Sequence, residues 1–112
     1  MKSPRRQAQH DQKRLAILSA ARRVIFRSGL DGARMRDIAA EADYTPGALY
    51  AYYPSKDHLL VDLAGSALGM AARSVRTGGT TDEAVRQLHR YFKDNAQDFD
   101  LLMSVLRSDR QD

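Results

Sequence analysis

Apolar residues recur along this chain at intervals of three and four positions, and no segment alternates between apolar and polar residues with a period of two. Spacings of three and four place side chains on one face of a helix, whereas alternation is typical of a strand. The sequence therefore predicts an all-α fold. The predicted helices cover residues 11–28, 34–42, 45–52, 56–75, 80–94 and 97–107.

The first predicted helix has a continuous buried face and a defined end. That face consists of Ile17, Ala21, Val24, Ile25 and Ser28. Gly29 follows at once and is a helix-ending residue. Residues 1–10 are polar and basic and contain Pro4, so they are expected to form a flexible basic arm.

Two short helices follow, joined by a tight turn. The helix over residues 34–42 begins without a good cap, because the side chains of Ala33 and Arg34 cap poorly. In the turn, Asp43 tolerates a left-handed backbone and Tyr44 can enter the core. Two helices joined in this way are typical of a helix-turn-helix motif.

The helix over residues 45–52 is short and needs support from the rest of the fold. Thr45 can cap it, and Pro46 suits its first position, where the missing N–H is no loss. Leu49 and Tyr53 lie four positions apart and supply a buried edge.

The opposite side of this helix carries small side chains flanked by two phenol groups. Its residues are Gly47, Ala48, Tyr50, Ala51 and Tyr52. Small side chains let a helix approach another molecule closely, so this surface is interpreted as one that enters the major groove of DNA. Aromatic residues more often belong to a core, but here Leu49 and Tyr53 already occupy the inward edge.

The second half of the chain is predicted to hold a long helix and two amphipathic ones. Ser55 is a good cap for the helix over residues 56–75, and Thr80 and Glu83 have the spacing of a capping box. The apolar residues of these helices include Leu63, Ala67, Met70, Val85, Leu88, Tyr91, Phe92, Phe99, Leu102, Met103 and Leu106. Large exposed apolar patches are rare in monomers, so a two-fold homodimer is expected.

Charge is unevenly distributed. Residues 1–36 hold ten basic groups against two acidic ones, a formal net charge of +8, and residues 37–112 hold eight against twelve, a net charge of −4. Such asymmetry is expected when the N-terminal part meets a polyanion. A solvated surface with a disordered basic tail would have the same composition, so charge alone leaves both interpretations open.

Length and composition exclude several classes of protein. A chain of 112 residues allows about one domain, and the lack of cysteine excludes disulfides and Cys-based zinc sites. No apolar run approaches the roughly 20 residues of a membrane span, so a soluble, cytoplasmic protein is expected. His10, His58 and His89 are scattered without carboxylate partners at ligand spacing. No metal site, cofactor or enzymatic activity is expected.

Three stretches stand in a specific order and register: Ile17-Leu18-Ser19-Ala20-Ala21, then Met35-Arg36-Asp37-Ile38-Ala39, then Thr45-Pro46-Gly47-Ala48-Leu49-Tyr50-Ala51-Tyr52-Tyr53-Pro54-Ser55-Lys56-Asp57-His58-Leu59-Leu60. Together they resemble the DNA-binding domain of the tetracycline-repressor (TetR) family. The resemblance covers about residues 10–62, and residues 91–106 are more weakly similar to that family's fifth and sixth helices.

The resemblance implies a transcription regulator, usually a repressor, that binds a palindromic DNA operator as a homodimer. A small-molecule effector is implied if a full-length C-terminal domain exists. The implied DNA-binding residues are Arg34, Arg36, Thr45, Pro46, Gly47, Ala48, Tyr50, Ala51, Tyr52 and Lys56. Of these, Gly47 and Ala48 would lie near base edges, and Tyr50, Tyr52 and Lys56 would contact phosphates.

Three features depart from the family's pattern. Ala33 and Arg34 stand where Thr or Ser is usual, so the charge of Arg34 would replace a phosphate contact, while Arg36 matches a position that can reach a base. Asp43 stands where Gly is usual, which places an acidic group near phosphates. The chain is also much shorter than is typical, and is either a piece of a longer protein or a naturally short member.

The expected organisation is a flexible basic arm (1–10), a three-helix helix-turn-helix DNA-binding domain (11–55), a connecting helix (56–76) and a partial regulatory and dimerisation bundle (80–112). The alternative is a truncated helical protein-interaction module that pairs with or sequesters full-length partners.

Overall fold

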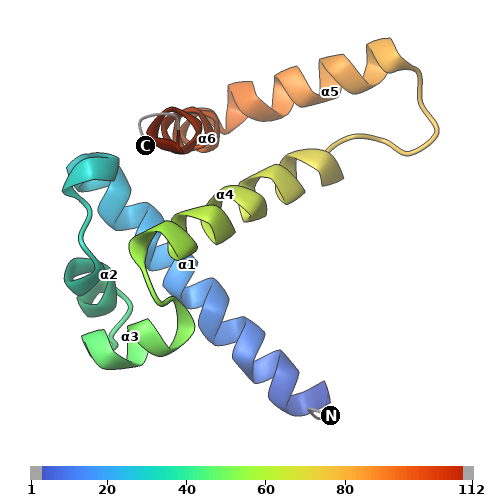
Figure 1. The fold of residues 1–112 in the computed structure, drawn as a ribbon. Helices are drawn as coiled ribbons and strands as arrows, with labels where there is room; N and C mark the ends of the chain where they lie inside the picture. The colour runs from blue at the N-terminus through green and yellow to red at the C-terminus, as the bar shows by residue number, and fades with distance from the viewer. Residues whose placement is uncertain (1–3, 110–112) are drawn as a thin grey trace. The chain divides into compact units, whose positions relative to one another are not determined.

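A computed structural model describes residues 4–109, and these residues form helices without strands (Figure 1). The helices are α1 (Pro4–Gly32), α2 (Met35–Glu41), α3 (Pro46–Tyr52), α4 (Lys56–Arg73), α5 (Thr81–Asp94) and α6 (Ala96–Asp109). The all-α prediction is confirmed. The chain divides into two compact units, residues 1–59 and residues 60–112. Among the described residues, no helix is both long and apolar enough to cross a membrane.

Helix α1 begins earlier than the sequence predicted. It starts at Pro4, so the prediction of a flexible arm is wrong for residues 4–10; residues 1–3 of that arm lie outside the described residues. Proline suits the first position of a helix, and the following Arg, Gln and Ala residues are strong helix formers. The Gln7 side-chain amide also donates to the Asp11 carboxylate at 3.2 Å, one helical turn away.

The regular part of α1 ends where Gly29 was predicted to end it. Gly29 has φ 77° and ψ 166°, a conformation outside the helical region that glycine adopts without steric cost. A further single turn follows, closed by a bond from the Ala33 N–H to the Gly29 carbonyl at 3.1 Å. This turn redirects the chain from α1 into α2.

Helices α2 and α3 form the predicted helix-turn-helix. Arg34 precedes α2 without a side-chain capping bond, in agreement with the poor cap expected there. In the turn, Asp43 has φ 66°, so it adopts the left-handed conformation that was predicted. The Thr45 hydroxyl accepts from the Ala48 N–H at 3.1 Å and caps α3, with Pro46 at its start.

A single apolar core joins these elements within the first unit. Its buried apolar side chains are Ile17, Leu18, Ala20, Ala21, Val24, Ala33, Met35, Ile38, Ala39, Leu49, Tyr53 and Leu59. An ion pair adds to this packing at the surface, since Glu41 at the end of α2 lies 2.5 Å from Arg27 and 3.6 Å from Arg23 of α1. Helix α2 is therefore tied to α1 by both apolar burial and charge.

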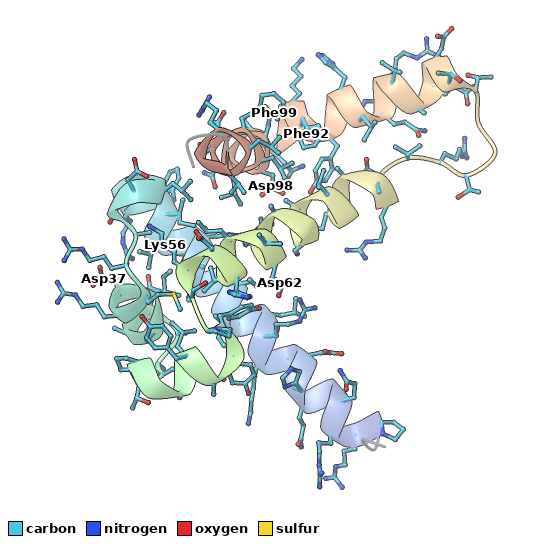
Figure 2. The ribbon with its side chains drawn as sticks, in the orientation of Figure 1. Asp37, Lys56, Asp62, Phe92, Asp98 and Phe99 are labelled. Atoms are coloured by element: carbon cyan, nitrogen blue, oxygen red, sulfur yellow. The ribbon has the colours of Figure 1, made fainter. Side chains whose placement is uncertain are left out.

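The second unit contains most of α4 together with α5 and α6. The capping box predicted at the start of α5 is present, with reciprocal bonds between Thr80 and Glu83. Where α5 meets α6, the Tyr91 hydroxyl donates to the buried Asp98 carboxylate at 3.1 Å. Phe92 and Phe99 pack edge to face beside them, with ring centroids 5.6 Å apart (Figure 2).

Much of the apolar surface of this unit is exposed, as the sequence predicted. Helix α5 has no buried residue, and Val85 on it is 60% exposed. Other exposed apolar side chains of the unit are Val61, Leu68, Met70, Phe99 and Leu106. By contrast, Leu63, Ala67 and Leu102 of the predicted apolar set are buried.

The ion pair between α1 and α2 predicts a specific dependence of stability on pH. The hydrogen bond from Arg27 lowers the pKa of Glu41 below its ordinary 4.5. A lowered folded-state pKa stabilises the fold above the unfolded-state pKa, and this contribution is lost as the pH falls through the folded-state pKa. Replacing Glu41 with Gln should therefore lower the free energy of unfolding slightly at neutral pH and leave it nearly unchanged in acid.

Urea unfolding of both proteins at about pH 7 and about pH 3 measures this difference. Asp31→Asn removes the same charge at an exposed position in the last turn of α1 and serves as the control. A difference between wild type and Glu41→Gln that persists unchanged in acid would contradict the assignment.

Candidate nucleic-acid interface

Helix α3 has two distinct sides, as the sequence predicted. Leu49 and Tyr53 are 0% and 6% exposed and face the core of the first unit. On the other side the exposed residues are Gly47, Ala48, Tyr50 and Ala51, with Tyr52 half-buried. The seven residues of α3 thus present a continuous outward surface while one edge holds the helix in place.

This outward surface is open near the start of α3. A Cβ atom built on Gly47 would meet no neighbouring atom within 4 Å, and the Gly47 backbone has no positive φ that would require glycine. The absence of a side chain there serves neither packing nor backbone geometry. It leaves the helix backbone accessible to a close approach by another molecule, which is what a helix in the major groove of DNA requires.

The outer aromatic residue Tyr52 contacts two other rings. Its ring stacks on His10 of α1, with centroids 5.2 Å apart and planes 25° from parallel. Tyr44, from the turn before α3, lies 6.1 Å from the same ring at a tilt of 39°. Tyr44 is half-buried, so it borders the core rather than filling it.

The part played by His10 was missed from the sequence because residues 1–10 were expected to be flexible. A signal was nevertheless present. His10 precedes the buried residues Ile17, Ala21 and Val24 of α1 by 7, 11 and 14 positions, so it continues their stripe in a longer helix. Once α1 begins at Pro4, this stripe carries His10 to α3.

A hollow of about 480 Å³ lies between α1 and α3. It is lined by Lys13, Asp43, Tyr44, Thr45, Ala48, Ala51 and Tyr52. Lys13 brings a positive charge to this surface and Asp43 a negative one. The two charges offset each other, so the hollow is not strongly basic. It adjoins the outward side of α3 at Ala48, Ala51 and Tyr52.

The basic residues of the predicted site have different environments. Arg34 and Arg36 are exposed at the start of α2, and their guanidinium groups are accessible to an anion. Lys56, in the first turn of α4 (Figure 2), is half-buried, and its ammonium donates to the Leu30 carbonyl at 2.6 Å. This bond joins the start of α4 to the last turn of α1, which follows Gly29. The sequence did not reveal this structural role.

The predicted residues all lie in the first unit. They come from the start of α2, from α3 with its cap, and from the start of α4. Within the part of the chain that is described, no group of three or more His, Asp or Glu side chains is placed to hold a metal ion.

Comparison with known proteins points to one family. Residues 17–63 match the family described as bacterial regulatory proteins, tetR family. The chain is 41% identical over 54 residues to the HTH-type transcriptional repressor KstR of Mycolicibacterium smegmatis, covering 48% of this chain and 26% of KstR. It is 42% identical over 55 residues to the HTH-type transcriptional regulator PksA of Bacillus subtilis, covering 49% of this chain and 27% of PksA. The chain thus spans about a quarter of the length of these curated relatives.

Two solved structures have a similar fold. A TetR-family transcriptional regulator from Haemophilus influenzae superposes with a TM-score of 0.64 at 25% identity, covering 83% of this chain and 56% of its own. A putative tetR family transcription regulator from a Shewanella species superposes with a TM-score of 0.61 at 29% identity, covering 77% and 50%. Both superpositions cover more of this chain than the first unit alone contains.

The left-handed turn before α3 predicts how substitutions at Asp43 change stability. Glycine adopts a positive φ freely, whereas alanine lacks the short polar side chain that makes this conformation tolerable for aspartate. Asp43→Gly should raise the free energy of unfolding by up to about 1 kcal/mol, and Asp43→Ala should lower it by about 1 kcal/mol. Urea unfolding of the three proteins checks both signs, and equal effects of Gly and Ala would contradict the turn geometry.

Proposed function

We propose that this chain, a member of the TetR family of bacterial regulatory proteins, regulates transcription by binding specific DNA sequences through α3. The single observation that carries the proposal is the two-sided environment of α3. Its inner edge is buried, and its outer side is exposed and open at Gly47. A helix presented in this way fits the width of the major groove, where base edges can be read.

The small residues and the tyrosines of α3 would have different tasks. Gly47 and Ala48 allow the backbone near the start of α3 to approach base edges. Tyr50 is 46% exposed and has a phenol hydroxyl free to reach a phosphate. Tyr52 would contact a phosphate from a more fixed position, because its ring is stacked on His10. Base contacts would supply specificity, and phosphate contacts would set the position of the helix on the duplex.

Basic residues outside α3 would add affinity. Arg34 and Arg36 are exposed beside the turn that leads to α3, and a guanidinium can form two parallel bonds to a phosphate or to a guanine edge. Lys56 uses one N–H for the Leu30 carbonyl, but an ammonium carries three, so a phosphate contact is compatible with this bond. Lys56 would therefore contribute a phosphate contact to the proposed interface.

The second unit would pair two copies of the chain. Its exposed side chains include Leu68 and Met70 of α4 and Val85 of α5. A two-fold dimer formed through this surface would present two α3 helices to half-sites about one helical turn apart, roughly 34 Å, on a palindromic operator. We further propose that the chain represses transcription in the cytoplasm and responds to a small-molecule effector if a larger C-terminal domain exists.

The same exposed surface favours a second candidate function. An α5 without any buried residue is also expected of a protein-interaction module that pairs with full-length relatives and sequesters them. Such a module would need no DNA contact of its own. The accessible outer side of α3 favours DNA binding as the primary function.

Substitution at Gly47 tests the role of α3 directly. Gly47→Glu should fold normally, because its Cβ meets no atom within 4 Å and glutamate is the better helix former. It should nevertheless lower affinity for DNA at least roughly 100-fold, because a carboxylate would be directed at bases and phosphates. The measurement is a gel shift with a duplex that wild type enriches from a random-sequence pool, with circular dichroism to check folding.

Gly65→Glu is the matched control, since Gly65 lies in α4 and a Cβ there also meets no atom within 4 Å. It makes the same change in charge in the second unit, outside α3, and should bind DNA nearly as wild type does. If Gly47→Glu keeps wild-type affinity, α3 does not enter the groove.

Sedimentation velocity tests the proposed pairing. At micromolar concentration the wild-type chain should sediment as a dimer, and Val85→Glu should shift it toward monomer by placing a charge in the apolar surface of α5. Arg86→Glu is the control, because position 86 is rotated by about 200° from Leu88 and faces away from that surface. A wild-type chain that stays monomeric at every concentration would rule out pairing through these helices.

A further inference from the structure

We infer that His10 positions α3 for sequence recognition, so the first turns of α1 belong to the DNA-reading apparatus. The inference rests on the proposed function and adds to it a residue that contacts no base. Its basis is the stack of His10 on Tyr52, which connects the N-terminal part of α1 to the last residue of α3.

The buried edge of α3 leaves one motion poorly restrained. Leu49 and Tyr53 lie four positions apart and so fall nearly on one line along the helix. Contacts along one line set the distance of α3 from the core, but they resist rocking about that line weakly. A helix of seven residues has few internal hydrogen bonds to stiffen it against such motion.

Tyr52 provides a restraint off that line. Successive helical residues are about 100° apart, so Tyr52, three positions after Leu49, projects from α3 about 60° away from the Leu49 side chain. His10 and Tyr44 contact its ring, the first by stacking at 5.2 Å and the second at a tilt of 39°. Two rings from separate segments of the chain thereby fix the rotation of α3 about its long axis.

Rotation of α3 matters unequally for the two kinds of DNA contact. Hydrogen bonds to base edges require placement within about 0.5 Å, whereas phosphate contacts are longer-ranged and insensitive to sequence. Loss of the stack should therefore weaken binding to a preferred sequence and leave binding to random duplex almost unchanged. Loss of a residue that itself touched the phosphates would weaken binding to the preferred sequence and to random duplex equally.

The variants follow from this difference. His10→Ala removes the ring and keeps high helix propensity, His10→Phe keeps a ring that can stack on Tyr52, and Gln12→Ala is a control at an exposed position of the same helix. Each protein is titrated with the duplex that wild type enriches from a random-sequence pool and with a scrambled duplex of the same composition.

His10→Ala should lose roughly three- to tenfold in affinity for the enriched duplex and less than about twofold for the scrambled one. His10→Phe should recover most of the loss, and Gln12→Ala should match wild type. Equal loss on both duplexes would identify His10 as a phosphate contact, and no loss on either would remove it from recognition. Either result overturns the inference.

A second measurement does not depend on DNA. The ring protons of Tyr52, assigned by NMR in the free protein, should shift on His10→Ala and stay close to wild type in His10→Phe. Unchanged chemical shifts in His10→Ala would show that the stack is absent. That result would overturn the inference about His10 and leave the proposed function standing. If wild type enriches no sequence while the shifts behave as expected, the proposed function fails and His10 is left with a structural role only.

Discussion

The burial of Leu49 and Tyr53 is the constraint on which the proposed function of this protein depends. A helix of seven residues is unstable in water by itself, so α3 exists because its inner edge is packed into the core of the first unit. One-sided burial has a second consequence. Since Leu49 and Tyr53 hold the helix, outward positions such as position 47 are released from packing and can carry small side chains, of which Gly47 is the clearest case.

Several basic side chains of the first unit bond within the protein, which changes the meaning of its formal charge. Residues 1–36 carry a formal net charge of +8, yet Arg23 and Arg27 pair with Glu41. Lys56, just beyond this segment, donates to the Leu30 carbonyl. These bonds hold α2 and the start of α4 against the C-terminal part of α1. The charge available to an anion is correspondingly smaller, and it includes the exposed residues Arg34 and Arg36.

The two units differ in how completely they bury their apolar residues. The first has a core drawn from α1, α2 and α3, whereas α5 of the second has no buried residue. Stability and DNA reading are therefore expected to depend mainly on the first unit, and association mainly on the second. This division agrees with the family match, which ends at residue 63, just beyond the boundary between the units.

Local signals in the sequence determined most of the secondary structure. The cap at Thr45, the left-handed turn at Asp43 and the capping box from Thr80 to Glu83 were all predicted, because each depends on residues only a few positions apart. The two sides of α3 followed from helical spacing for the same reason. Only the tertiary structure decided which distant groups meet: His10 on Tyr52, Lys56 on the Leu30 carbonyl and Arg27 on Glu41. Such pairs depend on how α1 crosses the other helices, and no spacing along the chain encodes that geometry.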